Sequence, residues 1–449
     1  MMRQCANKRR AKPDRRGHGG AALGHATLRG PLASARGSDW WAATATFLLA
    51  TAAVCAGERS DSTMPLAVRA GKVVTMNDSD AVINNAVVLV RDGKIERVAA
   101  QGEITIPDGY RVIDARDKWL VPGLVDAHNH TAGSLMDLND MVYLTNPGLR
   151  TLETIQPEND LVKSARAGGV TSVLLIPGSG TNLSGFGTIA KTAGRTVDEV
   201  VIKSPGSLKI AQAGNPEWYW YGVGRSFMNY NTRQTLEKAK AYHDAWTAYE
   251  NGQASKPPQY DPIFADFRGL FRGDFIVSVH TQIYQVVMTT VDMLAKKMNL
   301  RTVIDHGEFD GFKTAPMVLE TGAFAIEGPR GYWFDASQRK MLGLAASWWG
   351  KGVRKVGINT DAPVIPEEHL AFQAAMGCWY GWLPYPALRG VTRVGAEALM
   401  IDKRVGSLEP GKDADFGLWT GDPLDPRSSC EMTVVNGKVV YDASVYRRF

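Results

Sequence analysis

The sequence predicts an α/β protein in which a (β/α)8 TIM barrel is inserted in a small β-sandwich built from both chain ends. Three observations predict this architecture. The chain of 449 residues is too long for one ordinary hydrophobic core. Short strand-like segments gather near both ends, and apolar strands alternate with helices between them. Hydrophobic residues at 44% and charged residues at 22% are typical of a globular protein.

Both ends of the chain consist of short predicted strands separated by turn-forming residues. Asp92–Gly93 separates two N-terminal strands, and Asn436–Gly437 is a strong hairpin signal between the last two C-terminal strands. We expect residues 57–122 and 403–449 to form the two parts of the sandwich. The predicted strands are Leu66–Thr75, Ala86–Arg91, Lys94–Val98, Arg111–Asp114, Phe416–Trp419, Met432–Val435 and Lys438–Tyr441.

Predicted strands and helices alternate along residues 123–402, as they do in a parallel barrel. From Thr188 to Gln212 two strands follow each other with only Pro205–Gly206 between them, and residues 214–273 are typical of an elaborated loop. The predicted strands are Leu124–Ala127, Thr171–Ile176, Phe275–Val279, Thr302–Ile304, Ala323–Ile326 and Lys355–Ile358. The predicted helices are Asn159–Ala167, Thr232–Glu250, Tyr284–Met298, Ser337–Trp348 and Pro384–Leu399.

The first 56 residues have the pattern of an export signal. Residues 1–39 hold nine Lys or Arg against two Asp, and the apolar segment Trp40–Ala56 is too short for a confident membrane span. We therefore expect a periplasmic or extracellular protein without stable membrane insertion after signal removal. The alternative is a disordered leader on a cytoplasmic protein whose start is assigned too early. The remaining chain carries a slightly negative charge, which gives no reason to expect a nucleic-acid partner.

Four of the eight histidines follow predicted strands, as does one aspartate. The carboxyl ends of all parallel barrel strands lie on one face, where barrel active sites are built. Residues two apart on a strand point the same way, so His128 and His130 can hold one ion. Imidazole and carboxylate ligands suit a divalent transition metal such as zinc. The candidate ligands are His128, His130, His280, His306 and Asp361.

These residues resemble a known family. VPGLVDAHNH at Val121–His130, DHG at Asp305–Gly307 and TDAP at Thr360–Pro363 look like the amidohydrolase superfamily, in its imidazolonepropionase-like branch. The C-terminal segments Val405–Trp419 and Val434–Asp442 are similar to that group's closing strands. The resemblance spans about residues 64 to 443. It implies the barrel-in-sandwich fold and a water activated by one or two metal ions.

The resemblance also implies individual roles. His128 and His130 would bind the more buried metal together with Asp361, and His280 and His306 would bind a second metal. Asp361 would act as the base towards water and then as the acid towards the leaving nitrogen. The family pattern further implies a carboxylated lysine that bridges two metals. Lys209 resembles that position, with Lys203 as a competitor and an ordinary solvated lysine as the alternative.

The expected reaction is hydrolysis of a C–N bond in an amide, cyclic amide or small peptide, with a small molecule as the substrate. The alternatives are deamination of an amino-substituted ring and a catalytically inactive binding protein on the same fold. Ile283 stands where deaminases commonly place a glutamate, which disfavours deamination. In the Gly-rich segment Pro177–Gly187, Asn182 or Ser184 are candidate substrate contacts. Whether the chain forms a homo-oligomer stays open.

Overall fold

The strands of the computed structural model are arranged in two large sheets and one small hairpin. The structure describes residues 64–133, 139–212, 215–220 and 222–446, all within the unit Ser60–Phe449. The predicted leader, residues 1–56, lies outside the described residues. The boundaries predicted between the domains stay predictions.

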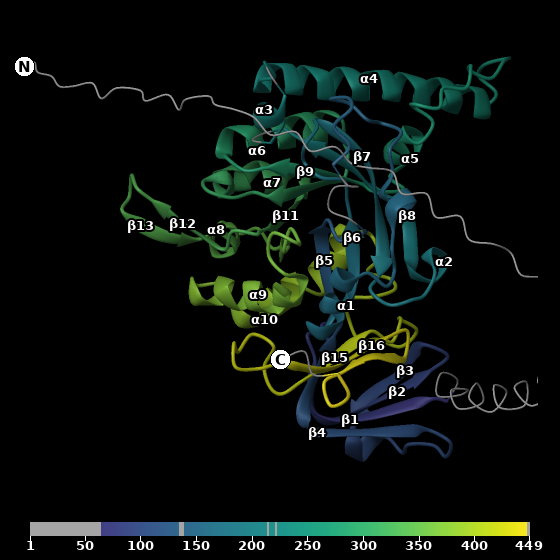
Figure 1. The fold of residues 1–449 in the computed structure, drawn as a ribbon, viewed down its shortest axis with the longest axis vertical. Helices are drawn as coiled ribbons and strands as arrows, with labels where there is room; N and C mark the ends of the chain where they lie inside the picture. The colour runs from purple at the N-terminus through teal and green to yellow at the C-terminus, as the bar shows by residue number, and fades with distance from the viewer. Residues whose placement is uncertain (1–63, 134–138, 213–214, 221, 447–449) are drawn as a thin grey trace, which may run out of the picture. The chain divides into compact units, whose positions relative to one another are not determined.

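One sheet is built from both ends of the chain. β4 of the N-terminal half pairs with β15 of the C-terminal half in antiparallel register, so strands about 300 residues apart lie side by side (Figure 1). The seven strands form one continuous sheet in the order β17-β16-β15-β4-β1-β2-β3, where a sandwich would have two. The strands are β1 (Leu66–Val74), β2 (Val82–Arg91), β3 (Lys94–Ala100), β4 (Arg111–Pro122), β15 (Phe416–Trp419), β16 (Cys430–Val435) and β17 (Lys438–Asp442).

The two predicted turns connect neighbouring strands of this sheet. Asp92–Gly93 joins β2 to β3 and Asn436–Gly437 joins β16 to β17. All four residues have positive φ, between 50° and 75°, as a two-residue hairpin of type I′ requires. One hydrophobic cluster takes side chains from both halves, including Val68 and Val88 with Phe416 and Val434, which shows that the chain ends share a core.

The second sheet is barrel-like and has eight strands in the order β14-β11-β10-β9-β8-β7-β6-β5. Its strands are β5 (Leu124–Asn129), β6 (Val170–Leu175), β7 (Leu183–Lys191), β8 (Val201–Ala211), β9 (Ile276–Thr281), β10 (Thr302–His306), β11 (Phe324–Glu327) and β14 (Val356–Ile358). The edge strands β5 and β14 are tied together because Asp126 Oδ2 accepts hydrogen bonds from the backbone N and Oγ1 of Thr360, just after β14.

The prediction of eight parallel strands is wrong at β7. This strand runs antiparallel to β6 and β8, whereas all other neighbours in the sheet are parallel. A short connection, residues 176–182, joins β6 to β7, which antiparallel pairing allows and a parallel crossover does not. Pro205–Gly206 lies inside β8 and does not separate two strands. The β6–β7 connection therefore lies at the same end as the parallel strands' carboxyl ends.

Most predicted helices are present, and three are corrected. The helix predicted at Tyr284–Met298 is an α-helix over Tyr284–Thr290 and continues as a π-helix over Val291–Lys297. Residues predicted as the helix Ser337–Trp348 begin in the hairpin of β12 (Tyr332–Asp335) and β13 (Lys340–Gly343), because the Asp335 carboxylate caps a turn through the backbone N of Ser337. Pro384–Leu399 is two helices, broken at Thr392. The helices are α1 (Asp160–Ala167), α2 (Val197–Val200), α3 (Asn215–Tyr219), α4 (Arg225–Glu250), α5 (Phe267–Arg272), α6 (Tyr284–Thr290), α7 (Ala315–Thr321), α8 (Leu344–Gly350), α9 (Leu370–Trp379), α10 (Pro384–Gly390) and α11 (Arg393–Ala398).

The region predicted as an elaborated loop contains the predicted helix Thr232–Glu250, which begins earlier, at Arg225, and two further short helices. It contains α3, the 26-residue α4 and α5. Buried apolar residues of α4 and α5, Leu236 and Phe267 among them, pack in one cluster with Phe186 of β7 and Val277 of β9. In the described part of the chain, no helix has both the length and the hydropathy to span a membrane.

Candidate metal centre

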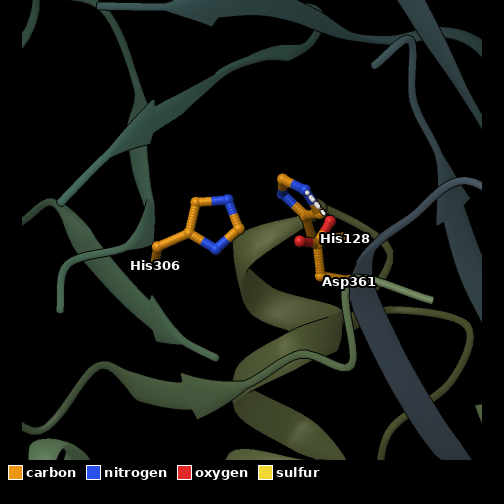
Figure 2. A group of neighbouring side chains, drawn as sticks. All are labelled: His128, His306 and Asp361. Carbon is orange, nitrogen blue, oxygen red and sulfur yellow. Dashed lines mark ion pairs between the residues drawn. The ribbon is translucent and has the colours of Figure 1, made fainter. Parts of the chain in front are cut away.

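The barrel strands bring the predicted ligands into one buried cluster. His128 lies in β5, His280 in β9 and His306 ends β10, while Asp361 follows β14. One ligand atom from each of His128, His306 and Asp361 lies within 4.8 Å of the others, and their side chains point toward one another (Figure 2). His130 is 7% exposed and His280 5% exposed. The structure therefore assembles on one end of the barrel residues separated by more than 230 positions in sequence.

Two histidines meet the same carboxylate oxygen. Oδ1 of Asp361 lies 3.2 Å from Nε2 of His128 and 3.1 Å from Nε2 of His130. The other two imidazoles form a second pair, with ring centroids of His280 and His306 4.4 Å apart. His128 links the pairs, since its ring centroid lies 4.8 Å from that of His306. The grouping into His128 with His130 and His280 with His306 matches the two pairs predicted from the sequence.

The Nδ1 atoms of these histidines are held by the protein. His130 Nδ1 donates to the carbonyl of Ile176 at 2.9 Å, and His306 Nδ1 donates to the carbonyl of Gly328. His128 Nδ1 lies 2.9 Å from the Asp305 carboxylate. A proton on Nδ1 leaves the lone pair on Nε2, which fixes the tautomer that ligates a metal through Nε2.

The cluster has the chemistry of a cation site. With the proton on Nδ1, the Nε2 lone pairs of His128 and His130 face an anionic oxygen of Asp361, an arrangement of acceptors that needs a positive charge between them. Nε2 of His280 and of His306 are buried without a hydrogen-bond partner among the described residues. Buried polar atoms normally have a hydrogen-bond partner. The unpartnered Nε2 lone pairs are therefore suited to coordinate a divalent metal.

Burial keeps most of the imidazoles neutral. It lowers the pKa of His306 to about 4, and it is also the largest cause of the lowered pKa of His130 and of His280. For His128, burial and Lys209 act to lower the pKa, but the Asp305 and Asp361 carboxylates raise it above the usual value. Burial acts to raise the pKa of Asp361, but the adjacent His128 and His130 side chains outweigh it and hold that pKa well below its usual range. Neutral imidazoles and an ionised carboxylate are the forms that bind metal.

Two members of the cluster have unusual backbone conformations. φ is +74° at His306 and +50° at Asp361, in the left-handed region that most non-glycine residues avoid. Each residue stands where a strand gives way to its following loop, so the backbone turns and redirects the side chain. Strained conformations of this kind concentrate at functional sites.

The structure separates the two candidate lysines. Lys209 of β8 is fully buried, and its Nζ lies 3.4 Å from His128 Nε2 and 3.8 Å from Asp305 Oδ2. Burial lowers the pKa of Lys209 to about 8. Lys203 instead interacts electrostatically with Asp274 and Arg301, which precede β9 and β10 at the opposite end of the strands. Lys209 therefore joins the cluster and Lys203 does not.

Sequence reasoning missed the role of Asp305. Alternation along a strand places Asp305 and His306 on opposite faces, yet both reach the cluster because the backbone turns at His306. The hydroxyl of Ser278, two residues before His280 in β9, donates to Asp305 Oδ2. The DHG motif was the available signal, but sequence alone gave no partner for its aspartate.

The segment between β6 and β7 contributes Ser179 to the site, with its Oγ 3.0 Å from Nδ1 of His280. The two residues predicted as substrate contacts are engaged elsewhere. Asn182 Nδ2 donates to the carbonyl of Ala211, and its Oδ1 accepts from Asn231 of α4. Ser184 Oγ donates to the carbonyl of Thr181 in a local turn. The structure thus brings neither Asn182 nor Ser184 to the histidines through a hydrogen bond.

A cavity of about 640 Å³ opens beside the cluster and is lined by His280, His306 and Asp361. Glu308, two residues after His306, also lines it, and burial raises the pKa of Glu308 to about 7. Burial and the neighbouring Glu308 raise the pKa of Glu327, at the end of β11, well above its usual value. The cavity joins the candidate metal ligands to solvent, as a site for a small substrate requires.

The fold and the site together define a barrel protein with a buried histidine–carboxylate centre suited to a divalent metal. The sequence model of the protein family described as the Amidohydrolase family matches residues 384–441 of this chain. The chain is 26% identical to the amidohydrolase tasK of Hapsidospora irregularis over 80% of this chain and 40% of that relative's length. It is 27% identical to an imidazolonepropionase of Pseudomonas entomophila over 76% of this chain and 88% of the relative.

The solved structures agree. An amidohydrolase from Thermotoga maritima MSB8 is 27% identical and superposes with a TM-score of 0.74, covering 84% of this chain and all of the other. A protein from Bifidobacterium longum described as a prolidase shares the fold at 18% identity and a TM-score of 0.52. The resemblance to amidohydrolases and imidazolonepropionases predicted from the sequence is confirmed.

Proposed function

We propose that this protein is a metal-dependent hydrolase that cleaves the C–N bond of an amide, a cyclic amide or a small peptide. One observation carries the proposal: four imidazole Nε2 atoms and the Asp361 carboxylate gather beside an open cavity. The similarity to imidazolonepropionases favours a cyclic amide among the three substrate classes.

The residues divide into two sets of ligands. We propose that His128, His130 and Asp361 hold the more buried ion, and that His280 and His306 hold a second ion with Lys209, carboxylated, between the two. The histidine-rich donor set suits zinc. A divalent ion bound here would lower the pKa of water to about 7 and polarise a carbonyl group.

The chain itself supplies the proton transfers and the shape of the site. The Asp361 side chain is 17% exposed and lines the cavity, so it can accept a proton from water and return it to the leaving nitrogen. Asp305, Ser179 and the carbonyls of Ile176 and Gly328 orient the four imidazoles from behind.

The test is a screen of dipeptides, N-acyl amino acids and cyclic amides with protein loaded with Zn²⁺ or Mn²⁺. We expect turnover in at least one class, and a loss of about 10³-fold or more in kcat for Asp361→Asn, because the variant lacks the proton acceptor and one ligand. Circular dichroism checks that the variant is folded. No turnover in any class would contradict the proposal.

The same screen separates the alternatives. A deaminase would release ammonia from amino-substituted rings, and Ile283, the residue that precedes α6, offers no carboxylate for that reaction. An inactive binding protein would bind ligands from these classes without product formation by wild type or by Asp361→Asn.

A further inference from the structure

The cavity beside the metal ligands has one apolar side and one cationic corner. Phe372 and Met376, one turn apart on α9, line it together with Val364 and Ile365. Phe372 is 48% exposed and Val364 62% exposed, so apolar surface faces solvent next to the candidate catalytic centre. Apolar walls with a few placed polar groups are typical of small-molecule sites.

The cationic corner is Arg330, on the loop that follows β11. The backbone of this loop is fixed at four successive residues. The carbonyl of Gly328 accepts from His306, that of Pro329 accepts from Gln373 Nε2 at 2.8 Å, and the carbonyl of Gly331 accepts from the backbone N of Leu344. The backbone N of Arg330 itself donates to Glu308 Oε1 at 3.1 Å. The loop is therefore a rigid support attached directly to a metal-ligand histidine.

Neighbouring residues orient the Arg330 guanidinium but do not use all of its hydrogen-bond donors. Its Nε lies 3.6 Å from Glu308 Oε2, and its Cζ lies 5.1 Å from the ring centroid of Phe309. The side chain is 53% exposed, and among the described residues neither terminal nitrogen has a protein hydrogen-bond partner within normal distance. Glu308 and Phe309 fix the stem side of the group and leave its two terminal nitrogens free to bind a carboxylate in a bidentate geometry.

We propose that Arg330 anchors a free carboxylate of the substrate, so that the substrate is an amide bearing a carboxylate and an apolar group that lies on Phe372 and Met376. Arg330 is the one Lys or Arg among the described residues that line this cavity. The inference rests on the proposed function, because the carboxylate would hold the scissile bond beside His280, His306 and Asp361. It makes Arg330 a specificity-determining residue.

The test compares two probes that differ in one group, N-benzoylglycine and N-benzoylglycinamide. Their affinities for the zinc-loaded protein are measured by isothermal titration calorimetry at pH 7. We expect the acid to bind about 10-fold or more tightly than the amide, as a charge-assisted hydrogen-bonded pair predicts. Arg330→Gln should weaken binding of the acid by a similar factor and leave the amide unchanged, and Arg330→Lys should restore part of the preference.

Arg354→Gln is the matched control, because Arg354 is exposed, packs over Trp349 and does not line the cavity. Equal affinities for the two probes, no measurable binding of the acid, or a preference that persists in Arg330→Gln would each overturn the proposal. The last result would mean that the carboxylate binds the metal directly. Release of benzoate is followed separately in the same samples, so failure of the proposed hydrolysis is a separate result.

Discussion

Asp305 Oδ2 lies 2.9 Å from Nδ1 of His128, and both side chains are fully buried. The carboxylate stands behind the imidazole, on the side away from Asp361, and the Ser278 hydroxyl and Lys209 ammonium also approach it. Such a partner sets the histidine tautomer and increases its basicity towards a metal.

The first prediction concerns this carboxylate. Asp305→Asn should reduce metal affinity by about 10- to 100-fold, because the neutral amide no longer holds the proton on His128 Nδ1. Competition with a chromophoric chelator measures the affinity. Asp244→Asn, on the exposed face of α4, is the control. Unchanged affinity in Asp305→Asn would show that His128 does not depend on this partner.

The second prediction concerns pH and the metal-free protein. The folded-state pKa of His306 is about 4 against an ordinary value of 6.5, so between these values the unfolded chain binds a proton that the folded chain does not. The free energy of unfolding should therefore fall by about 3 kcal/mol as pH drops through this window. Urea denaturation should show a smaller pH dependence in His306→Gln than in the exposed control His369→Gln. Identical slopes in the two variants would refute the prediction.

The third prediction concerns Lys209. Lys209→Met should lower the metal content of the loaded protein from two ions to one, because it removes the proposed bridge. Elemental analysis after gel filtration measures the ratio. Lys203→Met is the matched control, since that lysine lies at the other end of β8 and should keep two ions. Two ions in both variants would count against a bridging role.

The fourth prediction concerns an ionic cluster that ties the barrel-like sheet to the sheet of the chain ends. Lys191 of β7 is 3% exposed, its Nζ lies 2.9 Å from Asp413, and it also pairs with Asp415. Lys191→Met should lower the free energy of unfolding by about 3 kcal/mol, because it removes the cation that pairs with the buried Asp415 carboxylate, whereas Asp413 keeps Lys94 and Arg404.

The control for that variant is Lys240→Met, which removes an exposed pair on α4 and should change stability by about 0.5 kcal/mol or less. Chemical denaturation at neutral pH measures both variants. Similar effects of the two substitutions would show that the buried cluster contributes nothing beyond a surface pair.

The sequence predicted the ligands because they follow short apolar strands whose carboxyl ends must meet. His128, His280 and His306 could be placed at one face by this rule alone, and Lys209 by its resemblance to a family position. The antiparallel β7 could not be read in the same way, since the whole segment is buried and its apolar pattern carries no direction.

The residues behind and around the ligands were hidden for a different reason. Asp305, Ser179 and Arg330 act through contacts with residues far away in sequence, and no local pattern encodes such contacts. The turn at His306 also breaks the alternation that would place Asp305 on the opposite face. Asn182 is the opposite case, a residue whose predicted functional role the structure does not support. Its place in a Gly-rich segment suggested a substrate contact, but its amide links β8 to α4 through hydrogen bonds.

The most direct test of the metal hydrolase is reconstitution of the metal-free protein. Zn²⁺ is added in steps while bound metal and hydrolysis of a substrate from the screen are followed together. We predict negligible activity without metal, activity that rises in proportion to metal bound, and loss of both in His128→Ala and His306→Ala. Full activity in metal-free protein, or metal binding that survives unchanged in both variants, would contradict the assignment of this cluster as the catalytic centre.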